Sequence, residues 1–122
     1  MRFTIYAGSP SSDDFTVISS NGITGQLLTP GDTATAKIIT KDTFPVCILD
    51  NLPLTIIDLD NGVFNLSLTA EQTVLLEPKI GLEEDGYNPR ASHELYLDFN
   101  LASGFRQAVV DVHVKKVPEC QI

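Results

Sequence analysis

The side chains that could do chemistry in this sequence are few, and none stands in a recognisable catalytic pattern. His93 and His113 each lie near or on a segment with strand-like alternation. A metal site or an acid–base pair would need a third ligand or an orienting carboxylate beside them. Glu94 is next to His93 and Asp111 is near His113 in the sequence, but whether the two carboxylates share a face depends on a strand register that the sequence leaves open. We therefore predict two solvent-exposed strand histidines.

The cysteines and the acidic clusters also indicate structural roles. Cys47 lies in an apolar segment and is predicted to be a core residue, and Cys120 is far from it in sequence. Without a secretion signal, two reduced thiols are expected. The acidic residues at 58–60 and 83–85 lack the spacing of a calcium-binding loop, and there is no phosphate-binding loop or nucleophile elbow. We expect no catalytic residues, no metal and no cofactor, and therefore a protein that is not an enzyme.

The composition is that of one ordinary globular domain. The chain has 122 residues, and its 16 acidic and 8 basic residues give a net charge of −8. Such a surface repels nucleic acid phosphates and anionic membranes, so neither is an expected partner. No apolar run is long enough for a membrane helix or a signal peptide. The protein is therefore expected to act in the compartment where it is made, or in an assembly built there.

The best-specified local structure is a hairpin followed by a short helix. The apolar runs 54–59 and 63–68 flank Asn61-Gly62, a dipeptide typical of tight turns. Phe64, Leu66 and Leu68 alternate with polar residues, which predicts one buried face on the second strand.

The helix is predicted from its first residues. Thr69 and Gln72 have the spacing of a capping box, and Glu71 lies in the first turn. Ala70, Val74 and Leu75 are predicted to form its apolar side, and Pro78 to end it.

Further strands are predicted along the rest of the chain, separated by turn residues. The segment 7–14 is rich in Gly, Ser, Pro and Asp and is interpreted as a connector. The strands are expected at 3–6, 15–19, 33–41, 46–49 (at a sheet edge), 92–100 and 105–117. Seven or eight short strands at this spacing, with one short helix, predict a mostly β protein: a single immunoglobulin-like antiparallel β-sandwich over residues 1–122.

The segment 78–92 is longer than most connections, and such loops are often functional. It carries residue types that anchor interfaces, namely Ile80, Leu82, Tyr87 and Arg90. Two interpretations stay open: the loop is an interface with neighbouring subunits, or Ile80 and Leu82 fold back into the domain's own core.

The order of these motifs resembles a known group of proteins. The chain has the segments GDTATAKI, I-x-D-x-x-x-G-V-F-x-L-x-L-T and AEQTxxL, followed by a closing pair of strands. This order resembles the immunoglobulin-like domains of tailed-bacteriophage virion proteins, notably the N-terminal domain of the upper-baseplate-protein type. The resemblance implies a non-enzymatic tail, baseplate or adaptor subunit, assembled in the bacterial cytoplasm, with other virion subunits and further copies of itself as partners.

Two alternatives accompany this interpretation. Members of the baseplate group usually continue into a further domain, whereas this chain ends soon after Val117. The first alternative hypothesis is therefore a head decoration (cement) protein. The second alternative hypothesis is a carbohydrate- or receptor-binding module. Such modules use exposed aromatic platforms, and the chain has three Tyr and no Trp.

Overall fold

The fold is mostly β, with eight strands and one short helix in the described part of the chain. The structure is a computed structural model that describes residues 2–19, 22–41, 44–76 and 93–116. The elements in chain order are β1 (Arg2–Ala7), β2 (Ser11–Thr16), β3 (Thr33–Thr40), β4 (Cys47–Pro53), β5 (Thr55–Asp58), β6 (Val63–Leu68), α1 (Ala70–Val74), β7 (His93–Leu101) and β8 (Gly104–Lys116).

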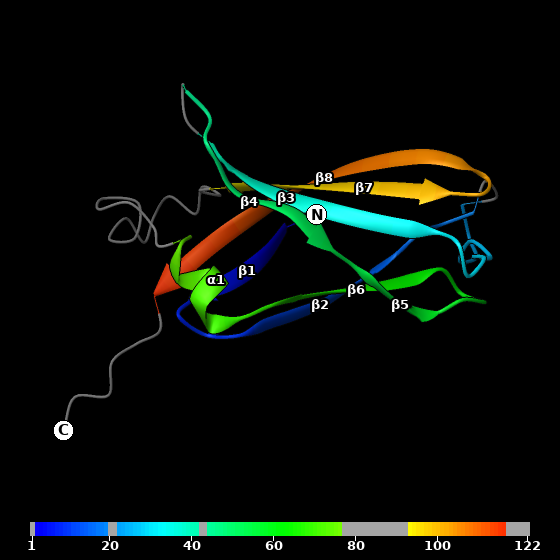
Figure 1. Cartoon of the computed structure of the whole chain (residues 1–122), viewed down its shortest axis with the longest axis horizontal. Coiled ribbons are helices and arrows are strands. Elements are labelled where there is room, and N and C mark those ends of the chain that lie inside the picture. Colours follow the sequence, from blue (N-terminus) through cyan, green and yellow to red (C-terminus); the bar gives the residue numbers. More distant parts are fainter. Residues whose placement is uncertain (1, 20–21, 42–43, 77–92, 117–122) are drawn as a thin grey trace.

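The strands form two sheets that lie one above the other (Figure 1). One sheet has five strands in the order β1-β8-β7-β3-β4, and the other has three in the order β2-β6-β5. All pairings are antiparallel except one, because β1 runs parallel to β8 from Arg2↔Asp111 to Ala7↔Lys116. The predicted wholly antiparallel arrangement is therefore wrong at this edge. Side-chain alternation indicates which face of a strand is buried, but it carries no information on strand direction where no hairpin joins the pair.

The apolar faces of the two sheets share one core. The ring centroids of Phe64 on β6 and Phe99 on β7 are 5.3 Å apart, which brings the two sheets into contact. The buried face predicted for β6 is confirmed, and β3, β7 and β8 each bury one face in the same core. Their most buried members are Ile38, Phe64, Leu66, Leu95, Leu97 and Val112, each with no more than 2% of its surface exposed.

The start of the chain differs from the prediction. Residues 11–14, predicted as a connector, form most of β2, and the strand ends at Thr16 rather than at residue 19. Polar side chains stabilise this strand on its solvent side: Asn65 Nδ2 donates to Ser12 Oγ (2.9 Å) and to Asp14 Oδ1 (2.8 Å). The composition of the segment is that of a turn, but these bonds to β6 favour the strand.

The hairpin between β5 and β6 is confirmed, and a carboxylate organises its turn. Gly62 has a φ of 71°, the left-handed conformation that glycine tolerates. The Asp58 carboxylate accepts from Asn61 Nδ2 (2.7 Å) and from the backbone N–H groups of Asp60 and Asn61. These bonds, the Asn61 side chain first, hold the pKa of Asp58 below its ordinary value. The acidic turn is thus satisfied by its own donors.

The helix begins as predicted but buries different residues. Thr69 and Gln72 form the expected capping box, and Glu71 lies in the first turn. Val74 and Leu75 are 47% and 60% exposed, so the predicted apolar side is wrong. A helix of one turn can bury only the positions that its neighbours cover. In α1 this is Thr73, and Leu76 just after the helix is also buried.

Thr73 joins the helix to the turn between β1 and β2. Its hydroxyl donates to the Ser9 carbonyl (2.8 Å) and accepts from the Gly8 N–H (3.1 Å). Thr73 has no exposed surface, so this hydroxyl satisfies two backbone groups inside the protein.

Cys47 begins the edge strand β4 and is exposed, so its predicted core position is wrong. Its cross-strand neighbour is Ile39, and register shifts on either side of Ile38 interrupt the pairing of β3 with β4. Cross-strand partners share a face, and Ile39 is not among the buried residues of β3. The edge position predicted for this strand is confirmed. Cys120 lies outside the described residues.

Candidate interaction surface

The four residues predicted to form an interface, Ile80, Leu82, Tyr87 and Arg90, lie outside the described residues, as does the whole of segment 78–92. Their role stays a prediction.

The two histidines do not form one site. His93 pairs with Val112 across β7 and β8, so the next residue along β8, His113, belongs to the opposite face. His93 is 5% exposed, and the predicted exposed position is wrong for it because it shares the buried side of β7 with Leu95 and Leu97. His113 is half-buried.

The carboxylates beside the histidines face each other. The register places Glu94 directly opposite Asp111, and Lys41 Nζ lies 3.0 Å from Asp111 Oδ1, which offsets the like charges. Within the described ranges, no three His, Cys, Asp or Glu side chains lie close enough together to hold a metal ion. Nor does any helix of the described chain have the length and apolar character needed to cross a membrane.

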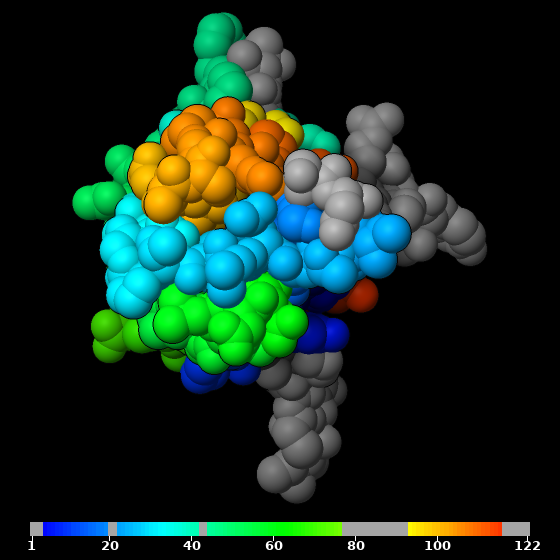
Figure 2. All heavy atoms as spheres, turned by 90° about the vertical axis from the view of Figure 1, so that its right-hand side faces the viewer, coloured from blue at the N-terminus to red at the C-terminus, as the bar shows by residue number. Residues whose placement is uncertain are grey.

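The most distinctive surface lies at the end of the molecule where three connections meet. These are the segment between β2 and β3, the β5–β6 turn and the β7–β8 turn, which face the viewer in Figure 2 as blue-to-cyan, green and orange layers. Large apolar side chains are exposed on these segments: Ile23 at 84%, Leu27 at 66%, Phe105 at 63% and Ile18 at 42%. Single exposed apolar residues are ordinary, but several on adjoining segments indicate a contact surface.

Two glycines allow the segment after β2 to cross closely over the β5–β6 turn. A Cβ at Gly25 would lie 1.8 Å from the Asn61 carbonyl oxygen, and one at Gly62 would lie 2.6 Å from the Gln26 carbonyl oxygen. The crossing is bonded by the N–H of Val17 to the Gly62 carbonyl (2.8 Å) and by the N–H of Gln26 to the Val17 carbonyl (2.7 Å). Residues without a side chain are therefore required at positions 25 and 62 for the segment after β2 to pack against the β5–β6 turn.

A buried carboxylate holds the other side of the same end. Asp32 is 7% exposed, and its carboxylate accepts from the Thr29 N–H and hydroxyl (2.9 Å each) and from the Ala102 N–H (2.8 Å). The backbone bond from Thr29 is the largest cause that lowers the pKa of Asp32. Because Ala102 lies in the β7–β8 turn, Asp32 fixes that turn to the start of β3.

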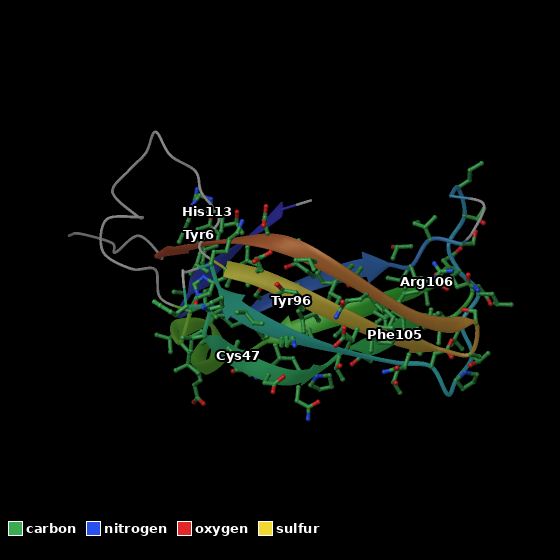
Figure 3. The ribbon with its side chains drawn as sticks, turned by 90° about the horizontal axis from the view of Figure 1, so that it is seen from above. Tyr6, Cys47, Tyr96, Phe105, Arg106 and His113 are labelled. Atoms are coloured by element: carbon green, nitrogen blue, oxygen red, sulfur yellow. The ribbon has the colours of Figure 1, made fainter. Side chains whose placement is uncertain are left out.

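A groove of about 250 Å³ opens between β8 and the segment that leaves β2. Residues 16–18 line one wall and residues 106–108 the other, with Phe99 between them in the lining. Arg106 bridges the groove, since its guanidinium donates to the Ile18 carbonyl and to Gln26 Oε1. Figure 3 places Arg106 and Phe105 toward the same end of β8, far from His113. The volume is smaller than that of most small-molecule sites, so the groove suits side chains better than a ligand.

The wall formed by β8 is also an open sheet edge. β1 pairs only with residues 111–116 of β8, and no other strand of the described chain runs along residues 104–110 on that side. Sequence reasoning missed this feature because it depends on where β1 stops. The available signal was Phe105 and Val109, two apolar residues that alternate with the buried residues of β8.

The comparisons give no relative from which a role could be transferred. A scan against protein-family models finds no match for this chain, and a search of curated proteins finds none that is similar to it.

Proposed function

We propose that the chain is a non-enzymatic structural subunit of a tailed-phage virion, an immunoglobulin-like tail, baseplate or adaptor protein that works by oligomeric assembly. Its partners would be other virion subunits and further copies of itself, and it would be assembled in the bacterial cytoplasm. The proposal starts from the resemblance of the sequence motifs and is supported by two features of the structure.

The strand order supports the immunoglobulin-like part of the proposal. In immunoglobulin domains the fourth and fifth strands join the second on one sheet, while the third, sixth and seventh form the other. If β4 is taken as an extra edge strand, β2, β5 and β6 correspond to the first set and β3, β7 and β8 to the second. The domain has no Trp for the core position that antibody domains use.

The observation that carries the assembly role is the end of the molecule defined by Ile18, Ile23, Leu27 and Phe105. These large apolar side chains are exposed although the protein has a net charge of −8 and many polar residues with which to cover itself. Interfaces are characterised by apolar and aromatic centres with few charges. A surface of this composition gains stability when another protein covers it.

The test is to look for the protein in purified virions of the phage that encodes it and to count its copies by quantitative mass spectrometry. We expect a fixed copy number per particle, in the range of a few to a few tens for a tail or baseplate position. A copy number in the hundreds would instead favour the head decoration alternative. Absence from virions, combined with binding to a glycan array, would refute assembly and favour the carbohydrate-binding alternative.

A further inference from the structure

The open edge of β8 has a backbone that is ready to pair. Ala102 and Ser103 form a two-residue turn, which makes Leu101 and Gly104 the hydrogen-bonded closing pair of the hairpin. In an antiparallel pair the backbone groups of alternate residues point toward the partner strand. Those of Gly104, Arg106 and Ala108 therefore point toward β7. The N–H and C=O groups of the residues between them, 105, 107 and 109, point out of the open edge.

The side chains of the same three residues form a symmetric set. Phe105 and Val109 are 63% and 49% exposed on the outer face of the five-stranded sheet, and they lie at equal distances on either side of Gln107. Gln107 Nε2 donates to Asp98 Oδ1 (2.7 Å), which turns its side chain toward β7 and away from the edge. The edge thus has an apolar residue on each side of Gln107, and the Gln107 side chain itself is bonded toward β7.

We infer that two copies of this chain associate edge to edge through residues 104–110 of β8, antiparallel and centred on Gln107. This inference deepens the proposed function, since it names the surface through which the subunit meets a second copy of itself. In this register Phe105 of each copy lies opposite Val109 of the other. The outward backbone groups of 105, 107 and 109 all find partners, so the two five-stranded sheets become one continuous sheet with a two-fold axis.

The distribution of charge favours a second copy at this edge over the other edges. Residues 104–110 contain no carboxylate, and their one charged side chain, Arg106, is held across the groove by its own domain. The edge strands β2, β4 and β5 each contain at least one Asp, so a symmetric pairing there would bring carboxylates of both copies into the contact. The remaining edge strand, β1, has α1 close beside it (Figure 1).

The contact is small, so the association is concentration-dependent. About seven residues of each copy take part, against roughly 20–30 a side in a stable interface. We expect a dissociation constant in the high micromolar range for the isolated protein. In a symmetric particle, many such contacts act together and make the assembly stable. Sedimentation equilibrium of the full chain from about 10 μM to 1 mM covers this range.

The first test blocks the centre of the pairing. Q107P removes the outward N–H at an edge position that tolerates proline, and the matched control Q107A removes the bond to Asp98 but keeps that N–H. We expect Q107P to weaken dimerisation at least tenfold and Q107A to change it less than threefold. Equal dimerisation of Q107P and wild type would overturn the inference, as would a wild type that is monomeric at 1 mM.

The second test depends on the register itself. The variants F105E/V109E and F105K/V109K place like charges opposite each other in a homodimer, and opposite charges when the two are mixed. Because both positions are exposed, each variant should fold, which circular dichroism checks. We expect each alone to be monomeric and the mixture to form a one-to-one heterodimer that high salt weakens. No heterodimer in the mixture would exclude this register.

These outcomes are separate from the fate of the proposed function. If the protein is found in virions and Q107P enters them as efficiently as wild type, the subunit is structural but the β8 edge is not its contact. If the dimer and the heterodimer form as expected but the protein is absent from virions, the edge pairing stands and the virion role fails.

Discussion

The close crossing of the segment after β2 over the β5–β6 turn predicts a graded series of glycine-to-alanine effects. Four glycines differ in two properties, a positive φ and a backbone atom in the space of a new Cβ. Gly31 has neither, Gly22 has only the positive φ (73°), Gly25 has only the contact, and Gly62 has both. The set separates conformational strain from steric exclusion within one domain.

The expected magnitudes follow from those properties. A Cβ in the left-handed region costs roughly 1–2 kcal/mol, and alanine returns about 0.4–1 kcal/mol by restricting the unfolded chain. We therefore expect G31A to be neutral or slightly stabilising and G22A to lose about 1 kcal/mol. G62A adds a contact of 2.6 Å with a backbone oxygen, and overpacking of that kind brings its loss to about 3 kcal/mol.

The loss of stability expected for G25A is limited by the free energy of undocking the segment after β2. A Cβ 1.8 Å from the Asn61 carbonyl oxygen cannot be accommodated by a side-chain rotation, so the segment must move away. Undocking exposes Leu28, which is worth roughly 1.5–3 kcal/mol. It also breaks the bonds of Gln26 to Val17 and of Leu28 to Leu59, at about 1 kcal/mol each. These terms give an expected loss of about 3.5–5 kcal/mol.

Guanidinium chloride unfolding measures the series, with equal m-values as the check that the denatured state is unchanged. In thermal scans each kcal/mol should shift the Tm by roughly 3–6 °C for a domain of this size. The reasoning is refuted if G25A lies within about 0.5 kcal/mol of wild type, or if G22A is as damaging as G62A. Either result would mean that the backbone crossing is not as close as the structure has it.

Three further predictions concern polar groups that join distant segments. D32N should lose about 2–3 kcal/mol at pH 7, because an amide cannot accept from all three donors that the carboxylate satisfies. These bonds lower the pKa of Asp32 in the folded state. The stability that they contribute is therefore present above the ordinary pKa of 3.8 and is lost as the pH falls further, so the unfolding free energies of wild type and D32N should converge below about pH 4 in acid unfolding curves. T73V should lose about 1–3 kcal/mol in denaturant unfolding and T73S much less, because only serine keeps a hydroxyl for the β1–β2 turn; equal losses would contradict the bonding role. R106M should change the unfolding free energy by less than about 1 kcal/mol but accelerate hydrogen exchange at Gln26, whereas R106K should be intermediate; unchanged exchange in R106M would show that the guanidinium does not hold this segment.

Local sequence patterns predict the structure correctly where it depends only on residues close in the sequence. The alternation of Phe64, Leu66 and Leu68 marks a buried face because a strand has only two faces. The Thr69 capping box involves residues three apart, so no tertiary contact is needed to form it. The glycine of the β5–β6 turn is required by its backbone conformation alone.

Patterns failed where a distant segment decides. Whether β1 runs parallel or antiparallel to β8 depends on the path of the intervening chain, which leaves no periodic signal in the strand itself. Thr73 is buried, and Val74 exposed, because the β1–β2 turn covers one side of a single helical turn. The prediction for Cys47 rests on its apolar segment and that for His93 on the lack of further ligands. The side of β7 on which His93 lies and the edge position of β4 determine their burial instead.

The edges of the two sheets differ in a way that composition does not explain. Natural β proteins protect exposed edges with charges, prolines and bulges. Here β2 carries Asp13 and Asp14, β5 ends in Asp58, and β4 combines Asp50 with a proline and shifts of register. The first half of β8 has none of these protections on its open side, although the chain has 16 acidic residues to place. An edge left unprotected in an otherwise guarded domain would promote uncontrolled aggregation unless a partner of defined geometry covers it. A symmetric second copy is such a partner, because the β8 edges of the two copies pair with each other and neither is left open to a third chain.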